Sequence, residues 1–522
     1  MERTQRLICV GAALVGVLGA EGCKFMAGVK DDTGGSSGGS GGVISVMTGG
    51  AGTTGAAGTT GAAGTPGGAG TTGAAGVGSA LPAKTCTNLQ CQQSTCTSGS
   101  CAVPACPGGA RTTVSGKIFD PAGTTPLYNV TVFVPNAPLD DIKDGPSCDP
   151  CDPVTGTSLL SGQPIVVAKT DVTGTFHLGM TGSADVPAGT DVPLVIQVGK
   201  WRRQVTIPTV TACVDNPLTD MDKSRLPRNQ AEGHIPKTAL TTGERDAMEC
   251  LLRKIGIADE EFTPEAGTGR VNLYAGGNGA SAYGMSPGGT VLNGGASFTP
   301  ANPWWDSLDN LKKYDIILHS CDGASYSAGI DPVFPKSLAA RQALNDFADL
   351  GGRVFASHWH AYWFENGTDA FKSIGTFDHE AGLPNPYDAT IDQTFDTGKA
   401  LAQWMLNVGG STTLGVVSIA QDASARLVAS AAGGIVSQRW IYGSDLAPPA
   451  VQFLSATTPI PGGTCGRAVI SDLHVSAGTG VDTDLPGQAF PTGCVTTTMS
   501  PREQVLEFML FDIASCVQRI IP

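Results

Sequence analysis

Residues 314–320 read YDIILHS, residues 338–350 read LAARQALNDFADL, and residues 353–357 read RVFAS. The first and last stretches are short apolar runs, which are typical of strands buried in a parallel sheet. The middle stretch has apolar residues at helical spacing and is followed by two glycines, which can end a helix. Strand, helix and strand in this order predict a right-handed βαβ unit. We therefore expect residues 238–522 to form an α/β domain with a doubly wound sheet.

The flanking sequence continues this pattern. Residues 244–255 have helical spacing, with apolar residues on one face, and residues 270–274 are expected to form a further strand. The glycine-rich segment 276–295 that follows lacks the GxxxxGK[ST] spacing of a phosphate-binding loop. A nucleotide phosphate site is therefore not expected there.

Residues 109–212 have a different character. Short segments of alternating hydrophobicity, such as 112–119, 130–134 and 192–198, are separated by turn residues. This pattern predicts an antiparallel β-sandwich. The polar, Pro- and Asp-containing residues 213–237 are expected to be a linker between the sandwich and the α/β domain.

The sandwich segment resembles a known family through residues 114–118, 126–132 and 170–176. In order and spacing these stretches are similar to the carboxypeptidase regulatory-like (transthyretin-like) domain, although the insertion around Cys148 and Cys151 departs from it. The resemblance implies a structural or sugar- or protein-contacting module without catalytic residues. Asp171 and Gly174 are accordingly expected to form a turn.

The α/β segment resembles a second family. Residues 314–318, 347–358 and 466–474 are similar to the class I glutamine-amidotransferase-like superfold, nearest its trehalose-utilisation-like branch. The resemblance implies a flavodoxin-like sheet. The family's enzymes carry a cysteine nucleophile on the sharp turn after the strand 353–357, where this chain reads Ser357-His358-Trp359-His360. Glutamine hydrolysis by that mechanism is therefore not expected.

Two further stretches, residues 199–203 and 249–257, are similar to exported bacterial proteins of which some carry the name tryptophan synthase α chain. That enzyme is a cytosolic TIM barrel with paired carboxylates. A cysteine-rich chain with a β-sandwich does not fit it, so this activity is not expected.

The N-terminus predicts export. Arg3 and Arg6 precede an uncharged, largely apolar run, and residues 1–22 as a whole have the features of a signal peptide. Ala20-Glu21-Gly22 followed by Cys23 resembles a bacterial lipoprotein signal, which implies that Cys23 is lipidated and becomes the first mature residue. Lys24 follows instead of the Asp that retains lipoproteins at the inner membrane, so the resemblance implies the outer membrane or cell surface. Simple secretion and a lack of export remain the alternatives.

Residues 23–85 are low in complexity, and Gly occurs at every third position from Gly49 to Gly76. The segment is expected to be a disordered tether, with a collagen-like trimer as the alternative. Cys86, Cys91, Cys96, Cys101 and Cys106 then follow at five-residue intervals, so residues 86–108 are expected to form a disulfide-stapled knob. Because five is odd, one of these thiols must pair elsewhere or stay reduced.

The 15 cysteines indicate an oxidising compartment. From proximity along the chain we expect Cys465 to pair with Cys494, and Cys148 or Cys151 to pair with Cys213. The net charge of −14 argues against nucleic acid as a partner, and no segment after the signal is long and apolar enough to span a bilayer.

The histidines are the main chemical signal. Only seven are present, and His319, His358, His360 and His474 follow predicted strands. Ligands of open α/β sheets bind at the carboxyl ends of strands, so these residues could form a ligand or metal site. Further candidate ligands close to them are Cys321 and Asp472. Residues 358–360 are expected to be extended, so that His358 and His360 point the same way. With Asp472 or His474 they could hold a divalent metal.

Two alternatives to a metal site remain. Ser357 could act as a nucleophile with His474 as its base, or the imidazoles could simply pack in the core with the neighbouring aromatic residues. We therefore hold two functional hypotheses. The first is a non-catalytic surface lipoprotein that binds glycan or protein. The second is a secreted metal-dependent or Ser/His hydrolase that acts on envelope carbohydrate.

Overall fold

The computed structural model describes residues 89, 95–97, 100–102, 106–151, 159–243, 245–276, 289–321, 336–381, 383–384, 386–420, 425–443, 450–474, 484–518 and 520. All of them belong to one compact unit, residues 78–522. The predicted signal peptide, lipidation at Cys23 and nearly all of the tether lie outside the described residues. Of the predicted knob, the structure describes Leu89, the antiparallel pair β1 (Thr95–Thr97) and β2 (Ser100–Ala102), and residues 106–108 with the start of η1 (Pro107–Gly109).

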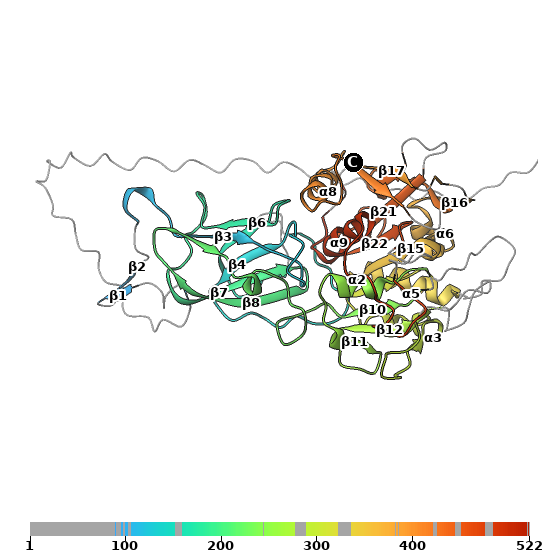
Figure 1. Cartoon of the computed structure of the whole chain (residues 1–522), viewed down its shortest axis with the longest axis horizontal. Helices are drawn as coiled ribbons and strands as arrows, with labels where there is room; N and C mark the ends of the chain where they lie inside the picture. Colours follow the sequence, from blue (N-terminus) through green and yellow to red (C-terminus); the bar gives the residue numbers. More distant parts are fainter. Residues whose placement is uncertain are drawn as a thin grey trace, which may run out of the picture. The chain divides into compact units, whose positions relative to one another are not determined.

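Two small sheets make up the predicted sandwich (Figure 1). The first has the order β6 (Thr175–Leu178), β3 (Thr113–Lys117), β9 (Asp215–Leu218), and the second has the order β5 (Pro164–Lys169), β4 (Thr131–Pro135), β7 (Gly189–Val198), β8 (Trp201–Val210). Buried apolar residues such as Val132, Phe176 and Ile196 fill the space inside, because alternate side chains of each strand face the core. The turn before β6 is formed as expected, with Gly174 at φ 76° and the Asp171 carboxylate accepting from the backbone N–H of Thr173 and Thr175.

The linker prediction differs from the structure. Residues 215–218 form β9, which pairs in parallel with β3, and Met221–Lys223 form a short 3₁₀ helix, η2. Part of the segment predicted as a linker thus completes the sandwich. The antiparallel prediction fails for this one strand, because its polar composition gave no strand signal.

A thirteen-stranded sheet forms the centre of the α/β part. Its main path is β11 (Phe262–Pro264), β12 (Val271–Ala275), β10 (Thr238–Thr241), β14 (Ile316–His319), β15 (Arg353–Ser357), β22 (Gly466–Ser471), β21 (Ala450–Thr458), β20 (Gln438–Gly443), β17 (Tyr387–Ile391), β18 (Val416–Ile419). Off this path lie β13 (Thr299–Pro300), which pairs with β12, and the pair β16 (Gly375–Ala381) and β19 (Ala425–Ala431).

The sheet is mixed. Neighbouring strands from β11 to β22 are parallel, as the βαβ prediction requires, and the predicted strands 314–320 and 353–357 are present as β14 and β15. From β21 onward all pairs are antiparallel. A doubly wound sheet therefore describes only part of this region.

Helices cover both faces of the sheet (Figure 1). On one face α2 (Met248–Lys254), α8 (Asp396–Asn407) and α9 (Pro501–Ala514) pack against Leu318, Phe355 and Val469. The opposite face, with Ile317, Val354 and Ile470, carries α3 (Ala301–Trp305), α4 (Leu308–Leu311), α5 (Leu338–Asp349), α6 (Tyr362–Glu365) and α7 (Asp369–Lys372). The strands alternate their side chains between these two layers. The predicted helix 338–350 is confirmed as α5, whereas α2 begins four residues later than predicted.

Four disulfides are present among the described residues, and the predicted pairings are wrong. Cys106 pairs with Cys213, Cys148 with Cys465, Cys151 with Cys516, and Cys250 with Cys494. The partners are 107 to 365 residues apart, because the topology of the fold, and not proximity along the chain, brings them together. Cys106 pairs with a cysteine outside the five-residue ladder, which is one of the two outcomes that the odd count left open.

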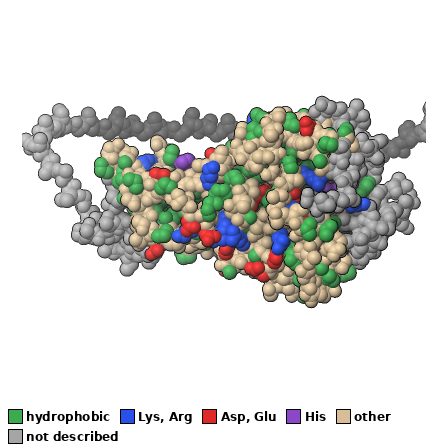
Figure 2. All heavy atoms as spheres, in the orientation of Figure 1, with side chains coloured by type: hydrophobic (Ala, Val, Ile, Leu, Met, Phe, Trp, Pro, Cys, Tyr) green, Lys and Arg blue, Asp and Glu red, His purple; other side chains and the backbone are tan. Residues whose placement is uncertain are grey.

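Two of these disulfides connect the sandwich insertion to the α/β part, and a buried ion pair between Lys200 and Asp315 makes a further connection. On the face drawn in Figure 2, basic and acidic side chains of the described residues lie beside one another. The helices of the described segments include none with the length and apolar composition needed to cross a bilayer.

Candidate functional site

Three adjacent parallel strands, β14, β15 and β22, end together at one edge of the sheet. Their registers pair His319 with Ala356 and Ser357 with Ser471, so the strand ends are level. Cys321, His358 and His474 follow these three ends, and one ligand atom of each lies within 4.8 Å of the others. All three are almost fully buried. The structure thus brings together three of the six residues predicted as ligands.

His358 occupies a strained position in this trio. It begins the turn after β15 with a φ of 43°, in the left-handed region that non-glycine residues rarely adopt. Its Nδ1 lies 3.5 Å from the sulfur of Cys321, and its ring centroid lies 4.4 Å from that of His474. Such strain persists only where surrounding structure holds it, and it is frequent at functional sites.

Asp246 supports the trio from the loop before α2. One of its carboxylate oxygens accepts a hydrogen bond of 3.3 Å from the backbone N–H of Cys321 and another from the hydroxyl of Ser357. Asp246 could not be recognised from the sequence, because an acidic residue near the start of a predicted helix has an ordinary explanation in the helix dipole. Ser357, the candidate nucleophile, is thereby hydrogen-bonded to a carboxylate.

The surroundings of His474 favour its neutral form. Burial, together with the charges of His358, Arg502 and Arg245, holds the pKa of His474 well below its usual value of 6.5. A neutral imidazole is the form of histidine that ligates metals.

His319 and His360 form a separate pair, and the prediction that His358 and His360 point the same way is wrong. Residues 358–361 form a 3₁₀ helix, η5 (His358–Ala361), in place of an extended segment. With three residues per turn, side chains two residues apart diverge. The ring of His360 instead stacks on that of His319, with centroids 4.8 Å apart.

This pair is built into the aromatic core. The indole N–H of Trp363 donates to Nδ1 of His360 over 3.0 Å, and Nδ1 of His319 lies 3.2 Å from the hydroxyl of Thr241. Burial lowers the pKa of His319 well below its usual value, and the charges of His360 and Lys336 add to this effect. These contacts are those of core residues, which is one of the alternatives that the sequence left open.

Asp472 is also buried and forms a hydrogen bond to a neighbouring strand. Its Oδ2 accepts from the backbone N–H of Val428 in β19 over 3.3 Å. It is not one of the three residues in the cluster of ligand atoms. The predicted set therefore divides into a trio, a stacked histidine pair and a carboxylate that binds backbone.

Comparisons with known proteins add little. No protein-family profile matches the sequence, and no curated protein is significantly similar to it. One similar solved structure is a type II cohesin–X–dockerin complex from Acetivibrio cellulolyticus, with 19% identity, a TM-score of 0.15, and coverage of 28% of this chain and 85% of that one. Another is a cytoplasmic protein from Salmonella typhimurium, with 11% identity, a TM-score of 0.23, and coverage of 46% and 94%. Neither similarity is close enough to carry an argument about function.

Proposed function

We propose that this chain is an exported lipoprotein of the cell envelope that acts by binding, and that its α/β part holds a transition-metal ion at Cys321, His358 and His474. The observation that carries the metal proposal is the convergence of these donors, within 4.8 Å, from the ends of three consecutive parallel strands. All three donors are almost fully buried, and one thiol with two imidazoles is a donor set that zinc takes in proteins.

The donor set suits zinc. A thiolate and two imidazoles are typical zinc ligands, at about 2.3 Å for sulfur and about 2.0 Å for nitrogen. In a tetrahedral site these bond lengths place ligand atoms about 3.5 Å apart. The sulfur of Cys321 and Nδ1 of His358 are already 3.5 Å apart, and the three ligand atoms all lie within 4.8 Å of one another.

The sequence supports the proposal that the protein is exported and anchored to a membrane by a lipid. The signal-like residues 1–22 and the lipoprotein-like Cys23 support it, and so do the four disulfides, which form in oxidising compartments. The binding partner would be a glycan or a protein at the outer membrane or cell surface. The carboxypeptidase regulatory-like and amidotransferase-like assignments belong to the same proposal. The parallel strands, with helices on both faces, support a flavodoxin-like core.

The second candidate is a metal-dependent hydrolase that acts on envelope carbohydrate. Three protein donors leave a fourth coordination position, which is the arrangement of catalytic zinc sites. The Ser/His variant has less support, because the Ser357 hydroxyl donates to Asp246. Activity on chromogenic glycosides and esters, lost together with the metal, would favour this candidate.

Cobalt binding tests the metal site directly. The full mature chain, stripped of metal, is titrated with Co²⁺ under anaerobic conditions while the thiolate-to-cobalt charge-transfer band is recorded. We expect about one equivalent to bind, zinc to displace it, Cys321→Ser to abolish the band, and His474→Ala to weaken binding about 100-fold. His177→Ala removes an exposed histidine of the sandwich and serves as the matched control. Binding far below one equivalent, or a band that survives in Cys321→Ser, would refute the proposal.

A further inference from the structure

Two adjoining hollows lie apart from the Cys–His trio. The first is lined by the antiparallel strands β19, β20 and β21, and the second extends from β20 and β21 to the end of α9 and to Tyr128 of the sandwich. One has a volume of about 650 Å³ and the other of about 570 Å³. Thr394, Phe395 and Gln438 line both hollows, so the two adjoin, and we call them together the β20 groove. Each half alone is as large as a typical small-ligand pocket, and together they suit a chain of linked units.

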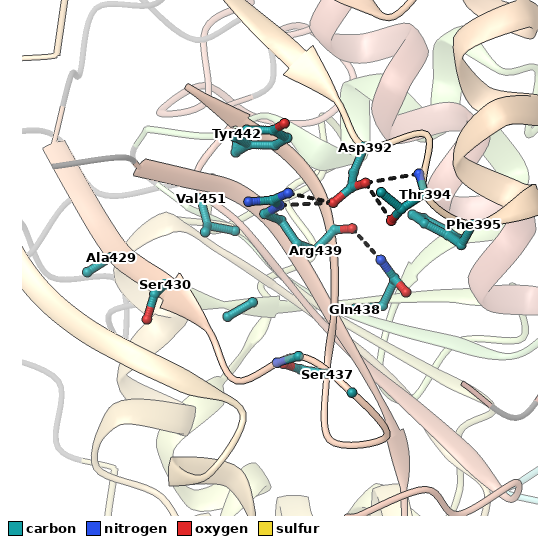
Figure 3. A pocket seen from close by; sticks show the side chains of 13 residues that line it. Asp392, Thr394, Phe395, Ala429, Ser430, Ser437, Gln438, Arg439, Tyr442 and Val451 are labelled. Atoms are coloured by element: carbon teal, nitrogen blue, oxygen red, sulfur yellow. Dashed lines mark hydrogen bonds and ion pairs between the residues drawn. The ribbon is translucent and has the colours of Figure 1, made fainter. Parts of the chain in front are cut away.

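The charges in the β20 groove are paired with one another. Arg439 donates to Oδ2 of Asp392 from Nε and Nη2, at 3.0 and 2.8 Å, and its guanidinium lies 3.6 Å from the ring centroid of Tyr442. Figure 3 shows this ion pair, with Thr394 hydrogen-bonded to the same carboxylate.

The second hollow repeats this arrangement, since Arg467 pairs with Asp512 there. On its rim Asp396 pairs with Lys399. A charged ligand would therefore meet charges that are already compensated, which favours an uncharged one.

The groove also offers hydrogen-bonding groups and an aromatic surface. Thr457 lines the second hollow and is only 3% exposed, and within the described part of the chain its hydroxyl has no hydrogen-bond partner. A buried hydroxyl without a partner costs stability, which a ligand hydroxyl would recover. Phe395, where the two hollows meet, is half-buried and held edge-on against Trp440, with ring centroids 4.8 Å apart. It presents an apolar ring between polar walls.

A peptide fits these observations less well. Extended peptides usually bind by adding a strand to an open sheet edge. The strand that runs along the groove, β20, is already flanked by β21 and β17.

We propose that the β20 groove binds a neutral, hydroxyl-rich oligosaccharide chain. A sugar ring would pack on Phe395, and a sugar hydroxyl would bond Thr457. This inference rests on the proposed binding role at the cell surface and names both the ligand class and its site. It does not depend on the metal.

Native gels that contain one soluble polysaccharide each provide the test. The full mature chain is run with dextran, laminarin, mannan or galactomannan as neutral polymers and with alginate as an acidic polymer. We expect retardation by at least one neutral polymer. Phe395→Ala should weaken it at least tenfold, because it removes the aromatic surface, and Thr457→Val should weaken it about fivefold, because it removes one hydrogen bond. The controls Leu414→Ala and Thr206→Val change exposed residues that do not line the groove and should behave as the wild type.

The inference would be overturned if no neutral polymer retards the protein, or if only alginate does. It would also be overturned if a neutral polymer retards the wild type and Phe395→Ala equally. A pool of unstructured peptides is also assayed by fluorescence polarisation. If the wild type binds peptides and Phe395→Ala does not, the groove is a peptide site, and the inference of an oligosaccharide ligand is overturned. Cys321→Ser should keep polysaccharide binding, and Phe395→Ala should keep cobalt binding. The two proposals can therefore fail separately.

Discussion

The ammonium group of Lys200, in the turn between β7 and β8 of the sandwich, lies 2.6 Å from Oδ1 of Asp315, just before β14 of the large sheet. Both side chains are buried, and Oδ2 of the same carboxylate accepts from the backbone N–H of Lys237. One ion pair thus connects the sandwich to the strand that leads to the Cys–His trio.

Lys200→Met should destabilise the protein strongly. It removes the closer of two cations at the buried Asp315 carboxylate and leaves Arg270, 3.9 Å away. Breaking a buried ion pair typically costs about 3–5 kcal/mol, so we expect a loss near the lower end of that range. Denaturant unfolding of the variant measures this loss. Lys399→Met, at an exposed ion pair with Asp396, is the matched control and should cost less than about 1 kcal/mol. Similar losses for the two variants would contradict the role given to Lys200.

Asp120 should make stability depend on pH between about 4 and 6. Burial raises the pKa of its carboxyl from 3.8 to about 6, and Glu507, whose pKa is also raised, lies next to it. A raised pKa means that the folded state binds the proton more tightly. The stability from this group is therefore complete below pH 3.8 and is lost as the pH rises through 6, by about 3 kcal/mol in all.

Asp120→Asn should remove this part of the pH dependence. Unfolding free energies at pH 4 and pH 7 would then differ less in the variant than in the wild type. Asp171→Asn should act in a different pH range, because hydrogen bonds from Thr173 and Thr175 lower the pKa of Asp171 despite some burial. The stability from Asp171 is complete above pH 3.8 and is lost below it, so this substitution should leave the difference between pH 4 and pH 7 nearly unchanged. An unchanged pH profile in Asp120→Asn would argue against the raised pKa.

His358→Gly should be more stable than His358→Ala. Both substitutions remove the imidazole, but only glycine adopts a φ of 43° without strain. The expected difference is about 1 kcal/mol in unfolding free energy. The same pair of substitutions at His360, in the helical turn, should show the reverse order, since glycine is the poorer residue in a helix. If alanine were favoured at both positions, the strained turn would be in doubt.

The disulfide pairs can be mapped directly. Peptides from a non-reducing digest should contain Cys148 joined to Cys465 and Cys151 joined to Cys516, and Cys321 should react with a thiol reagent only after unfolding. Replacing both Cys151 and Cys516 by Ser should lower the unfolding free energy by about 2–5 kcal/mol. A Cys465–Cys494 peptide would contradict the fold described here.

Local patterns predicted the parallel centre of the fold. The hydrophobic periodicity of β14, α5 and β15 is visible within each short stretch of sequence. These stretches also correctly indicated that side chains after the strand ends would meet. The antiparallel strands from β21 to β18 lie in the sheet in a different order from their order in the chain, and α8 separates β17 from β18. Their pairing therefore depends on contacts that no local pattern contains.

The candidate site was only partly predictable for the same reason. That Cys321, His358 and His474 follow strand ends can be read from the sequence, but the separation of His360 from His358 depends on whether the chain turns or extends after Ser357. Asp246 lies in a loop, 75 residues before Cys321, to whose backbone N–H it bonds. Such a relationship is set by tertiary packing alone.

The bond between Cys151 and Cys516 spans 365 residues, and Cys148 to Cys465 spans 317. Neither ring can close until almost the entire polypeptide has been made, so covalent locking of the N-terminal module must be among the last events of maturation. Once closed, the rings confer tolerance to proteases. A single cut in the backbone between Cys151 and Cys465 would leave both pieces joined, and the nicked molecule would separate only on reduction.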